Sequence, residues 1–319
     1  MAGFEPEAAA SRGLQAIGAF EAELSFGKQR GLWSDAWRRL IRNRLASIAL
    51  VLLLSVALLA FVGARGGPTG RFDPSDQNFS AIQTGPTLDN WFGTDQLGRD
   101  QFARTLEGVR ISLQIGFGAQ FVVLIIGLSV GASAALGGKW SDNLLMRFTD
   151  IMYSFPDLLA IILLRSVLIG HHWPVITNKK VIIILAIGLV AWTTTARLVR
   201  GQMLSLTERD YVLAARALGA TRWRIVTQHM LPNTLGPVIV AITFGIPAAI
   251  FAEAALGFLG LGLPPPAASL GTLVNGGYQT IQRNVWNVVF PAGAIAVLML
   301  SFTFIGDGLR DALDPRTRG

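Results

Sequence analysis

The sequence predicts an all-α membrane protein with six transmembrane helices and with both its N and C termini cytoplasmic. Three observations lead to this fold class: an apolar composition, a series of long stretches without charge, and an uneven placement of basic residues. Of the 319 residues, 51% are hydrophobic and only 15% are charged, whereas an ordinary soluble domain has about 25% charged residues. This composition argues against a soluble enzyme and against a disordered chain.

Five stretches are long enough and apolar enough to cross a bilayer. A helix needs about 20 apolar residues to span a hydrocarbon core about 30 Å thick. Four of the stretches carry no charge and the fifth carries a single one, Glu253. We therefore predict spans within residues 45–64, 111–138, 181–196, 231–269 and 285–306.

A sixth span over residues 148–170 is less obvious, because it contains Asp150, Asp157 and Arg165 and a charge at mid-membrane is costly. The basic residues decide the question. With six spans, 18 Lys and Arg residues fall in cytoplasmic segments and 8 in outer ones, as the positive-inside rule requires. Without the sixth span, the six arginines of residues 197–233 would face outward. We therefore predict that 148–170 crosses the membrane.

The same distribution explains the net charge of +7. The basic residues flank the spans and do not form one patch, so they indicate orientation in the lipid bilayer and no nucleic-acid partner. A first span preceded by 44 residues that include acids is expected to stay as an anchor, not to be cleaved as a signal peptide.

The sequence offers little for catalysis or metal binding. It has no cysteine, which excludes a disulfide scaffold, a zinc-thiolate site and a cysteine nucleophile. It also lacks the glycine-rich loop that cradles nucleotide phosphates. The adjacent pair His171 and His172 has no third ligand nearby in the sequence. We therefore predict no catalytic residue and no metal site, and we expect this pair to be ordinary loop residues.

Two segments before the second span carry further signals. In residues 31–44, aromatic and aliphatic residues recur at helical spacing among arginines, which indicates an amphipathic helix at the membrane interface; a plain extension of the first span is nearly as good an interpretation. Residues 65–110 form an extracytoplasmic loop of 46 residues, long enough to be functional. Its candidate residues lie in one glycine-containing turn, followed by a short helix over 100–110: Gly93, Thr94, Asp95, Gly98, Arg99 and Asp100.

The main cytoplasmic loop predicts two short helices, over residues 208–218 and 221–230, joined at Gly219. Glycine is favoured at a helix end because it adopts the left-handed backbone conformation, and Pro232 is expected to follow the end of the second helix. Ala214, Ala215 and Ala217 keep the first helix narrow. Small residues of this kind allow close approach, so the pattern predicts a docking surface bordered by arginines.

Glu253 is the one ionisable residue inside a strongly apolar span. An intramembrane acid is by default a candidate for a functional site. A hydrogen-bonded or protonated acid at a contact between helices is an equally good interpretation. A proton-coupled carrier would usually show more such groups at matched positions of two repeats, and we find no internal repeat.

The cytoplasmic loop resembles the Glu-Ala-Ala loop of permeases in binding-protein-dependent ABC importers. Its pattern is matched at Ala214, Ala215, Gly219, Ile225, Leu231 and Pro232, whereas Leu213 stands in place of the usual glutamate. The runs at residues 37–44, 92–100, 258–265 and 306–315 narrow the resemblance. Together they are similar to the C-type permease subunit of the dipeptide/oligopeptide/nickel importer family, from about residue 33 to the end.

The resemblance implies a type I ABC importer permease fold and a set of partners. These are a homologous B-type permease, two ATP-binding subunits that hold ATP and Mg, and an extracytoplasmic substrate-binding protein. No cofactor is bound by this chain itself, which is expected to lie in a bacterial or archaeal cell membrane. The resemblance places ATPase coupling in the cytoplasmic loop, with these candidate residues: Tyr211, Ala214, Ala215, Arg216, Gly219, Ala220, Arg222, Ile225, Leu231 and Pro232.

These interpretations divide the chain into four parts. We expect a mobile cytoplasmic tail over 1–32 and a cytoplasmic tail over 309–319. Residues 33–110 hold the amphipathic helix, the first span and the outer loop. Residues 111–308 hold a core of five spans with the coupling loop at 201–233. Peptides are the expected cargo; nickel chelates or another small solute are the alternative, and a self-sufficient carrier or channel using Glu253 is a more distant one.

Overall fold

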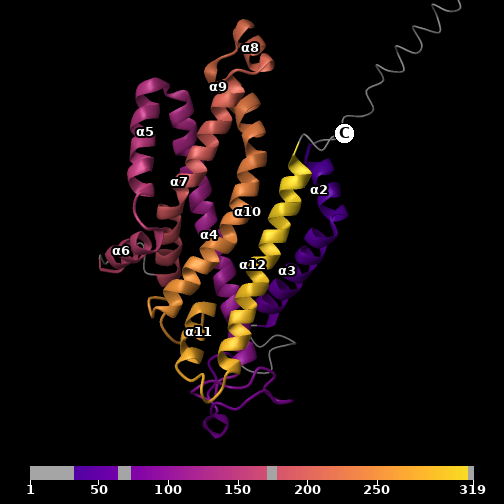
Figure 1. The fold of residues 1–319 in the computed structure, drawn as a ribbon, viewed down its shortest axis with the longest axis vertical. Coiled ribbons are helices and arrows are strands. Elements are labelled where there is room, and N and C mark those ends of the chain that lie inside the picture. Colours follow the sequence, from indigo (N-terminus) through magenta and orange to yellow (C-terminus); the bar gives the residue numbers. More distant parts are fainter. Residues whose placement is uncertain (1–31, 64–72, 171–177, 315–319) are drawn as a thin grey trace, which may run out of the picture.

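The computed structural model describes residues 32–63, 73–170 and 178–314, and these are almost entirely helical. The helices form an elongated bundle (Figure 1). The short helices α8 (Asp210–Ala217) and α9 (Arg222–Ile225) lie at one end, and α11 (Leu270–Tyr278) lies at the other, next to the loop of residues 73–100. The described residues contain no strand longer than an isolated bridge between Thr94 and Asp100.

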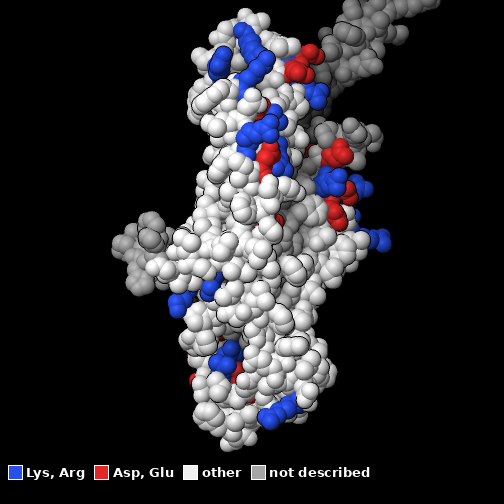
Figure 2. All heavy atoms as spheres, turned by 60° about the vertical axis from the view of Figure 1, so that its left-hand side comes forward, with Lys and Arg blue, Asp and Glu red and all other residues white. Residues whose placement is uncertain are grey.

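Five helices are long and apolar enough to cross a membrane, which confirms the five clear predictions. Figure 2 shows one face of the bundle. Lys, Arg, Asp and Glu gather toward its upper and lower parts, and few lie in the band between them. The chain is therefore a multi-pass membrane protein. The five helices are α3 (Arg44–Gly63), α4 (Gln101–Leu136), α7 (Lys179–Thr207), α10 (Leu231–Phe258) and α12 (Trp286–Leu313).

The predicted sixth span, residues 148–170, is not one continuous helix. The chain instead forms α5 (Gly138–Tyr153) and α6 (Asp157–Gly170), which are bent by 94° relative to each other. Pro156 lies in the break, because proline lacks a backbone N–H and disfavours the helical conformation of the residue before it.

The pair α5 and α6 nevertheless has to carry the chain across. Helices α4 and α7 are parallel: Gly118 lies against Ile184, and further along Gly131 lies against Val199. Two parallel spans that follow one another need one crossing between them. The broken pair therefore supplies the sixth crossing, and the inference from basic residues is confirmed.

Two acids of α5 face arginines of α7, and one of them is Asp150, which made this span doubtful. Asp150 accepts from Arg197 at 3.0 Å, and Asp142 receives two hydrogen bonds from Arg200. The Arg197 guanidinium also lies 4.4 Å from the centre of the Tyr153 ring. Pairing between neighbouring helices lowers the cost of charges near the membrane.

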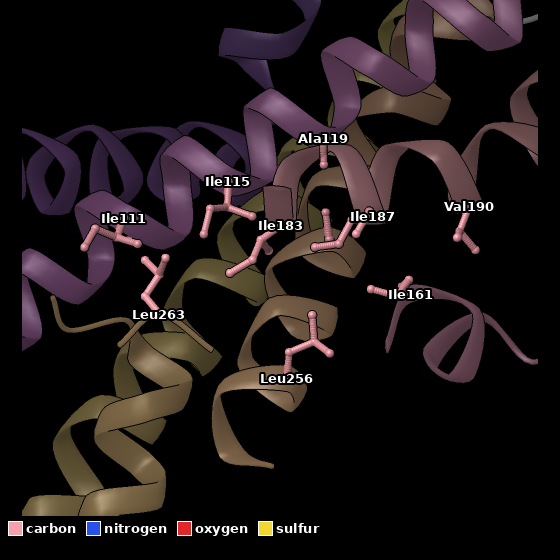
Figure 3. Close-up of a cluster of buried hydrophobic side chains, with 11 residues drawn as sticks. Ile111, Ile115, Ala119, Ile161, Ile183, Ile187, Val190, Leu256 and Leu263 are labelled. Carbon is pink, nitrogen blue, oxygen red and sulfur yellow. The ribbon is translucent and has the colours of Figure 1, made fainter. Parts of the chain in front are cut away.

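The packed core joins α4, α7 and α10, with Ile161 contributed by α6 (Figure 3). Ile115, Ile183 and Leu256 are fully buried there. Glycines bring α4 and α7 close together: a Cβ on Gly188 would lie 2.6 Å from the Cβ of Val122. Small residues are common at such contacts because helices in membranes associate by close packing.

A second group of contacts attaches the N-terminal helices to the C-terminal one. The amphipathic helix is present as α2 (Leu32–Arg42). It buries Ala36 and Leu40 in a cluster with Ala312 of α12, and leaves Trp37 exposed. Both ends of the described chain thus lie on the same side of the bundle (Figure 1). Residues 1–31 and 315–319 lie outside the described residues, as does the pair His171 and His172.

Three further boundaries differ from prediction. The helix expected over 100–110 is the first part of α4, not a separate element. The helix α12 continues through the expected tail boundary at 309 to Leu313. The stretch 231–269 does not form one span: α10 ends at Phe258, and Ser269 caps the separate helix α11. Gly260 and three prolines at 264–266 occupy the gap, and proline cannot continue a helix.

Candidate functional sites

The cytoplasmic loop turns as predicted at its glycine. Gly219 has φ of 79°, a left-handed conformation that only glycine adopts without strain. Its N–H donates to the carbonyl of Arg216 at 2.9 Å, and the N–H of Ala220 donates to the carbonyl of Ala215 at 3.0 Å. These bonds close the end of α8.

The second short helix is not separate, contrary to the prediction over 221–230. After α9, residues Val226–Met230 form a π-helical turn that runs directly into α10. Pro232 did not end the helix, because it lies in the first turn of α10, where the missing N–H of proline costs little. The loop is therefore rooted in a 37-residue helical rod, Arg222–Phe258.

Three buried side chains hold this loop against the bundle. Val212, Ile225 and Met230 pack in one cluster with Val199 and Met203 of α7. Ala215 and Ala220 pack against the same cluster. At these two positions, the small residues of the motif therefore pack the loop against other parts of the same chain.

The opposite side of the loop exposes large apolar groups. Leu218 is 88% exposed, Trp223 is 76% exposed and Leu213 is 47% exposed. Around them lie the exposed arginines Arg216 and Arg222. We call Leu213, Leu218 and Trp223 the loop tip. An exposed apolar group rimmed by charge indicates an interaction site.

Among the predicted coupling residues, the structure therefore separates two groups. Tyr211, Ala214, Arg216, Gly219, Arg222 and Pro232 are exposed. Ala215, Ala220, Ile225 and Leu231 are half-buried or buried within the chain. The motif had not singled out Leu218 and Trp223; the only available signal was a large apolar residue directly beside the helix-ending glycine.

The outer loop holds itself together, in contrast. Gly93 and Gly98 have φ of 77° and 71°. A Cβ on Gly98 would lie 1.8 Å from the carbonyl oxygen of Asn78, so only glycine fits there. The hydroxyl of Thr94 bonds the carbonyl of Ala81, and Asp100 caps α4 by accepting from Ala103 N–H at 2.8 Å.

Asp95 is the centre of this loop. Its Oδ1 accepts from the N–H groups of Leu97 and Arg99 at 2.8 and 3.0 Å. Its Oδ2 lies 2.7 Å from Nε of Arg99 and 3.4 Å from Nε of Arg104. All six predicted loop residues are thus brought together, in bonds that build the loop.

Glu253 lies where α10 crosses α4. It is 0% exposed, and its Oε2 accepts from the hydroxyl of Ser112 at 2.9 Å. It lines neither of the two cavities described next. The geometry is that of a hydrogen-bonded acid at a helix contact.

A cavity of about 730 Å³ opens near the outer loop. Its walls come from that loop, α6, the segment 260–267, α11 and the starts of α4, α7 and α12. The charged residues in its lining are Asp95, Arg99, Arg104, Arg165 and Lys179. A second cavity of about 340 Å³ lies at the break between α5 and α6, lined by Gln120, Asp157 and Thr193–Thr195 among others. Both volumes are in or near the range of small-molecule sites.

Comparisons with known proteins give a consistent result. Residues 115–319 match the family described as binding-protein-dependent transport system inner membrane component. Residues 31–86 match the family described as the N-terminal TM domain of oligopeptide transport permease C. Together the two matches include most of the chain that the structure describes.

Individual relatives are similar over nearly their whole length. The oligopeptide transport system permease protein OppC of Bacillus subtilis is 40% identical over 315 residues, which cover 99% of this chain and 97% of the relative. The dipeptide transport system permease protein DppC of the same organism is 43% identical over 287 residues, 89% of this chain and 86% of the relative. Among solved structures, a chain of the inward-facing MetNI methionine ABC transporter has a similar fold, with a TM-score of 0.54, 22% identity, and coverage of 66% of this chain and 96% of that one.

Proposed function

This chain belongs to the family of binding-protein-dependent transport system inner membrane components, and on that premise we propose that it is the C-type permease subunit of an ATP-driven peptide importer. It forms one half of the translocation pathway, and a homologous B-type permease forms the other. Two ATP-binding subunits carry ATP and Mg. An extracytoplasmic binding protein delivers the cargo. The expected location is a bacterial or archaeal cell membrane.

The loop tip carries this proposal. Leu213, Leu218 and Trp223 are exposed at the cytoplasmic end, while the segment beneath them is buried against α7 and α10. A surface held rigidly from below suits docking into a groove of a separate subunit. The sequence lacks a phosphate-binding loop, so ATP hydrolysis is assigned to that subunit.

The π-helical turn offers a route for the motion. Because α9 continues into α10 without a break, a displacement of the loop tip is transmitted along the rod Arg222–Phe258. That rod lines the cavity at the break between α5 and α6 through Phe244, Gly245 and Ala248. We place the translocation path along this side of the chain.

The peptide cargo rests on the names of the relatives, OppC and DppC. A nickel chelate or another small solute remains the alternative cargo within the same type of importer.

The first test is a purification. A C-terminal tag on this chain, with membranes solubilised in mild detergent, is expected to recover a second six-span permease and one or two ATP-binding subunits. Purification of the chain alone, combined with transport in liposomes without ATP, would contradict the importer proposal.

The second test targets the loop tip. Leu218→Glu places a charge on an 88% exposed position, so it is expected to leave membrane insertion and thermal stability unchanged. ATP-dependent uptake is expected to fall at least tenfold, and co-purification of the ATP-binding subunits is expected to weaken. Gln228→Glu, also exposed in this region, is the matched control. Normal uptake by Leu218→Glu would contradict a coupling role for the loop tip.

A carrier that uses Glu253 makes a different prediction. In that case Glu253→Gln abolishes transport, because the carboxyl must exchange a proton. If the acid is a packing group, as its bond to Ser112 suggests, the glutamine variant keeps the hydrogen bond and uptake stays within about twofold.

A further inference from the structure

We propose that the outer cavity is a binding site for a free peptide, with its C-terminal carboxylate held by Arg165 and Lys179 of the cavity lining. This inference rests on the proposed function, since it names a contact for the cargo. It concerns the outer side of the chain, far from the loop tip.

The charge balance of the cavity favours an anion. Four basic residues line it against a single acid. That acid, Asp95, already accepts from the Nε of Arg99 and lies beside Arg104. Arg165 and Lys179 are therefore left as the cations without an acidic partner among the described lining residues.

Arg165 is held in place by one hydrogen bond, but not all of its N–H donors have a partner. Its Nη2 donates to the carbonyl of Gly262 at 3.2 Å, and this bond fixes the guanidinium at the wall of the cavity. Its Nε is buried and has no hydrogen-bond partner. A guanidinium with free donors in a confined site is suited to a carboxylate, which it binds through two parallel hydrogen bonds.

Two buried amide side chains form a polar part of the same cavity wall. Gln101 and Asn287 both line it, and they are only 1% and 2% exposed. The amide nitrogen of Gln101 donates to the backbone carbonyl of Asn287 at 3.2 Å. The side-chain oxygens of both residues are buried without a partner. Buried acceptors of this kind normally have partners, so these two oxygens mark an unsatisfied polar region in the cavity wall.

Size and composition fit a short peptide. The volume of about 730 Å³ is within the range of sites for small molecules. The wall from residues 260–267 and α11 is formed by small, apolar and neutral polar residues, four of them glycines and two prolines. Such a wall does not select for one kind of peptide side chain, whereas the cations Arg165 and Lys179 select for a negatively charged C-terminus.

The test uses the whole complex, with its partner permease, ATP-binding subunits and binding protein, reconstituted in proteoliposomes. Uptake is measured for dialanine and for its C-terminal amide. The binding protein's own preference between these two peptides is the same for every permease variant, so it cancels when the ratio of the two rates is compared between a variant and the unmodified complex. Arg165→Gln is expected to lower dialanine uptake about tenfold and to lower uptake of the amide less than twofold.

Controls separate charge from structure. Arg283→Gln removes an exposed outer arginine that does not line the cavity, and its ratio is expected to match that of the unmodified chain. Arg165→Lys, which keeps the charge, is expected to recover part of the preference for the free acid. If Arg165→Gln fails to assemble, Lys179→Gln at the exposed edge gives the same comparison, with a ratio expected to fall at least threefold.

The outcomes are distinguishable. An equal fall for both peptides, or no fall with either variant, overturns the inference and leaves the importer in place. A fall for both peptides together with weaker binding of the binding protein assigns the cations to docking of that protein, and also overturns it. If the unmodified complex imports neither peptide, the proposed peptide transport itself fails and this inference fails with it.

Discussion

The two ends of this molecule are built in opposite ways. The cytoplasmic loop, residues 208–230, is anchored from below by Val212, Ile225 and Met230 and exposes Leu218 and Trp223. The outer loop, residues 73–100, turns its polar groups onto itself through Asp95, Thr94 and two glycines. The cytoplasmic loop is fixed by buried apolar anchors and the outer loop by its own hydrogen bonds. Both loops expose large apolar side chains, and Leu88 of the outer loop is 90% exposed.

This difference indicates two kinds of role. A loop that is firmly seated but exposes apolar groups gains stability when a partner covers them. A loop that satisfies its own hydrogen bonds keeps its shape without a partner. It can therefore act as a fixed wall for the outer cavity. The comparison predicts that substitutions at the outer loop destabilise the fold. At the cytoplasmic end, it predicts that substitutions of buried anchors lower stability and substitutions at the loop tip do so much less.

The largest effect is expected at the outer loop. Gly98→Ala forces a left-handed φ of 71° on alanine and drives its Cβ into the carbonyl of Asn78. We expect a loss of about 5 kcal/mol or more, because the clash is with backbone atoms that cannot move aside. The measurement is thermal unfolding in detergent, followed by tryptophan fluorescence. Gly276→Ala is the control on the same side, because nothing lies within 4 Å of its added Cβ. Equal melting of the two variants would contradict a self-supporting loop.

A smaller effect is expected beneath the loop tip. Ile225→Ala removes a side chain that is 4% exposed, which should cost about 2–5 kcal/mol by leaving a cavity. Leu213→Ala, at a position that is 47% exposed on the same loop, should cost much less. Similar losses of stability at both positions would show that the loop is not divided into anchors and tip. The same melting assay, with limited proteolysis at this loop, checks both variants.

The smallest effect is expected where α5 meets α7. Arg197→Gln breaks an ion pair with Asp150 whose side chains are 37% and 56% exposed. Pairs this exposed contribute at most about 1 kcal/mol. We therefore expect a shift in melting temperature of only a few degrees that shrinks further in high salt. A large, salt-independent loss would show that the broken span depends on this pair.

The sequence by itself determined the number of crossings, the orientation and the place of the cytoplasmic turn. Apolar length and basic residues are sufficient for the first two, because the bilayer imposes one thickness and one charge rule on every span. Gly219 was predictable because a left-handed backbone position selects glycine locally. The family also followed from local motifs, since four runs in order are difficult to match by chance.

Only the tertiary structure decided how the crossings are made and which motif residues are accessible. The 94° break at Pro156 and the pairing of Arg197 and Arg200 of α7 with the acids of α5 are not revealed by the positions of these residues in the sequence. Ile225 and Leu218 are both apolar residues near one glycine, yet one is buried and the other is exposed. That assignment depends on the direction in which the rod Arg222–Phe258 leaves the bundle. The outer cavity likewise joins Arg165, Gln101 and Asn287 from three distant helices, and no local pattern reports a contact made between them.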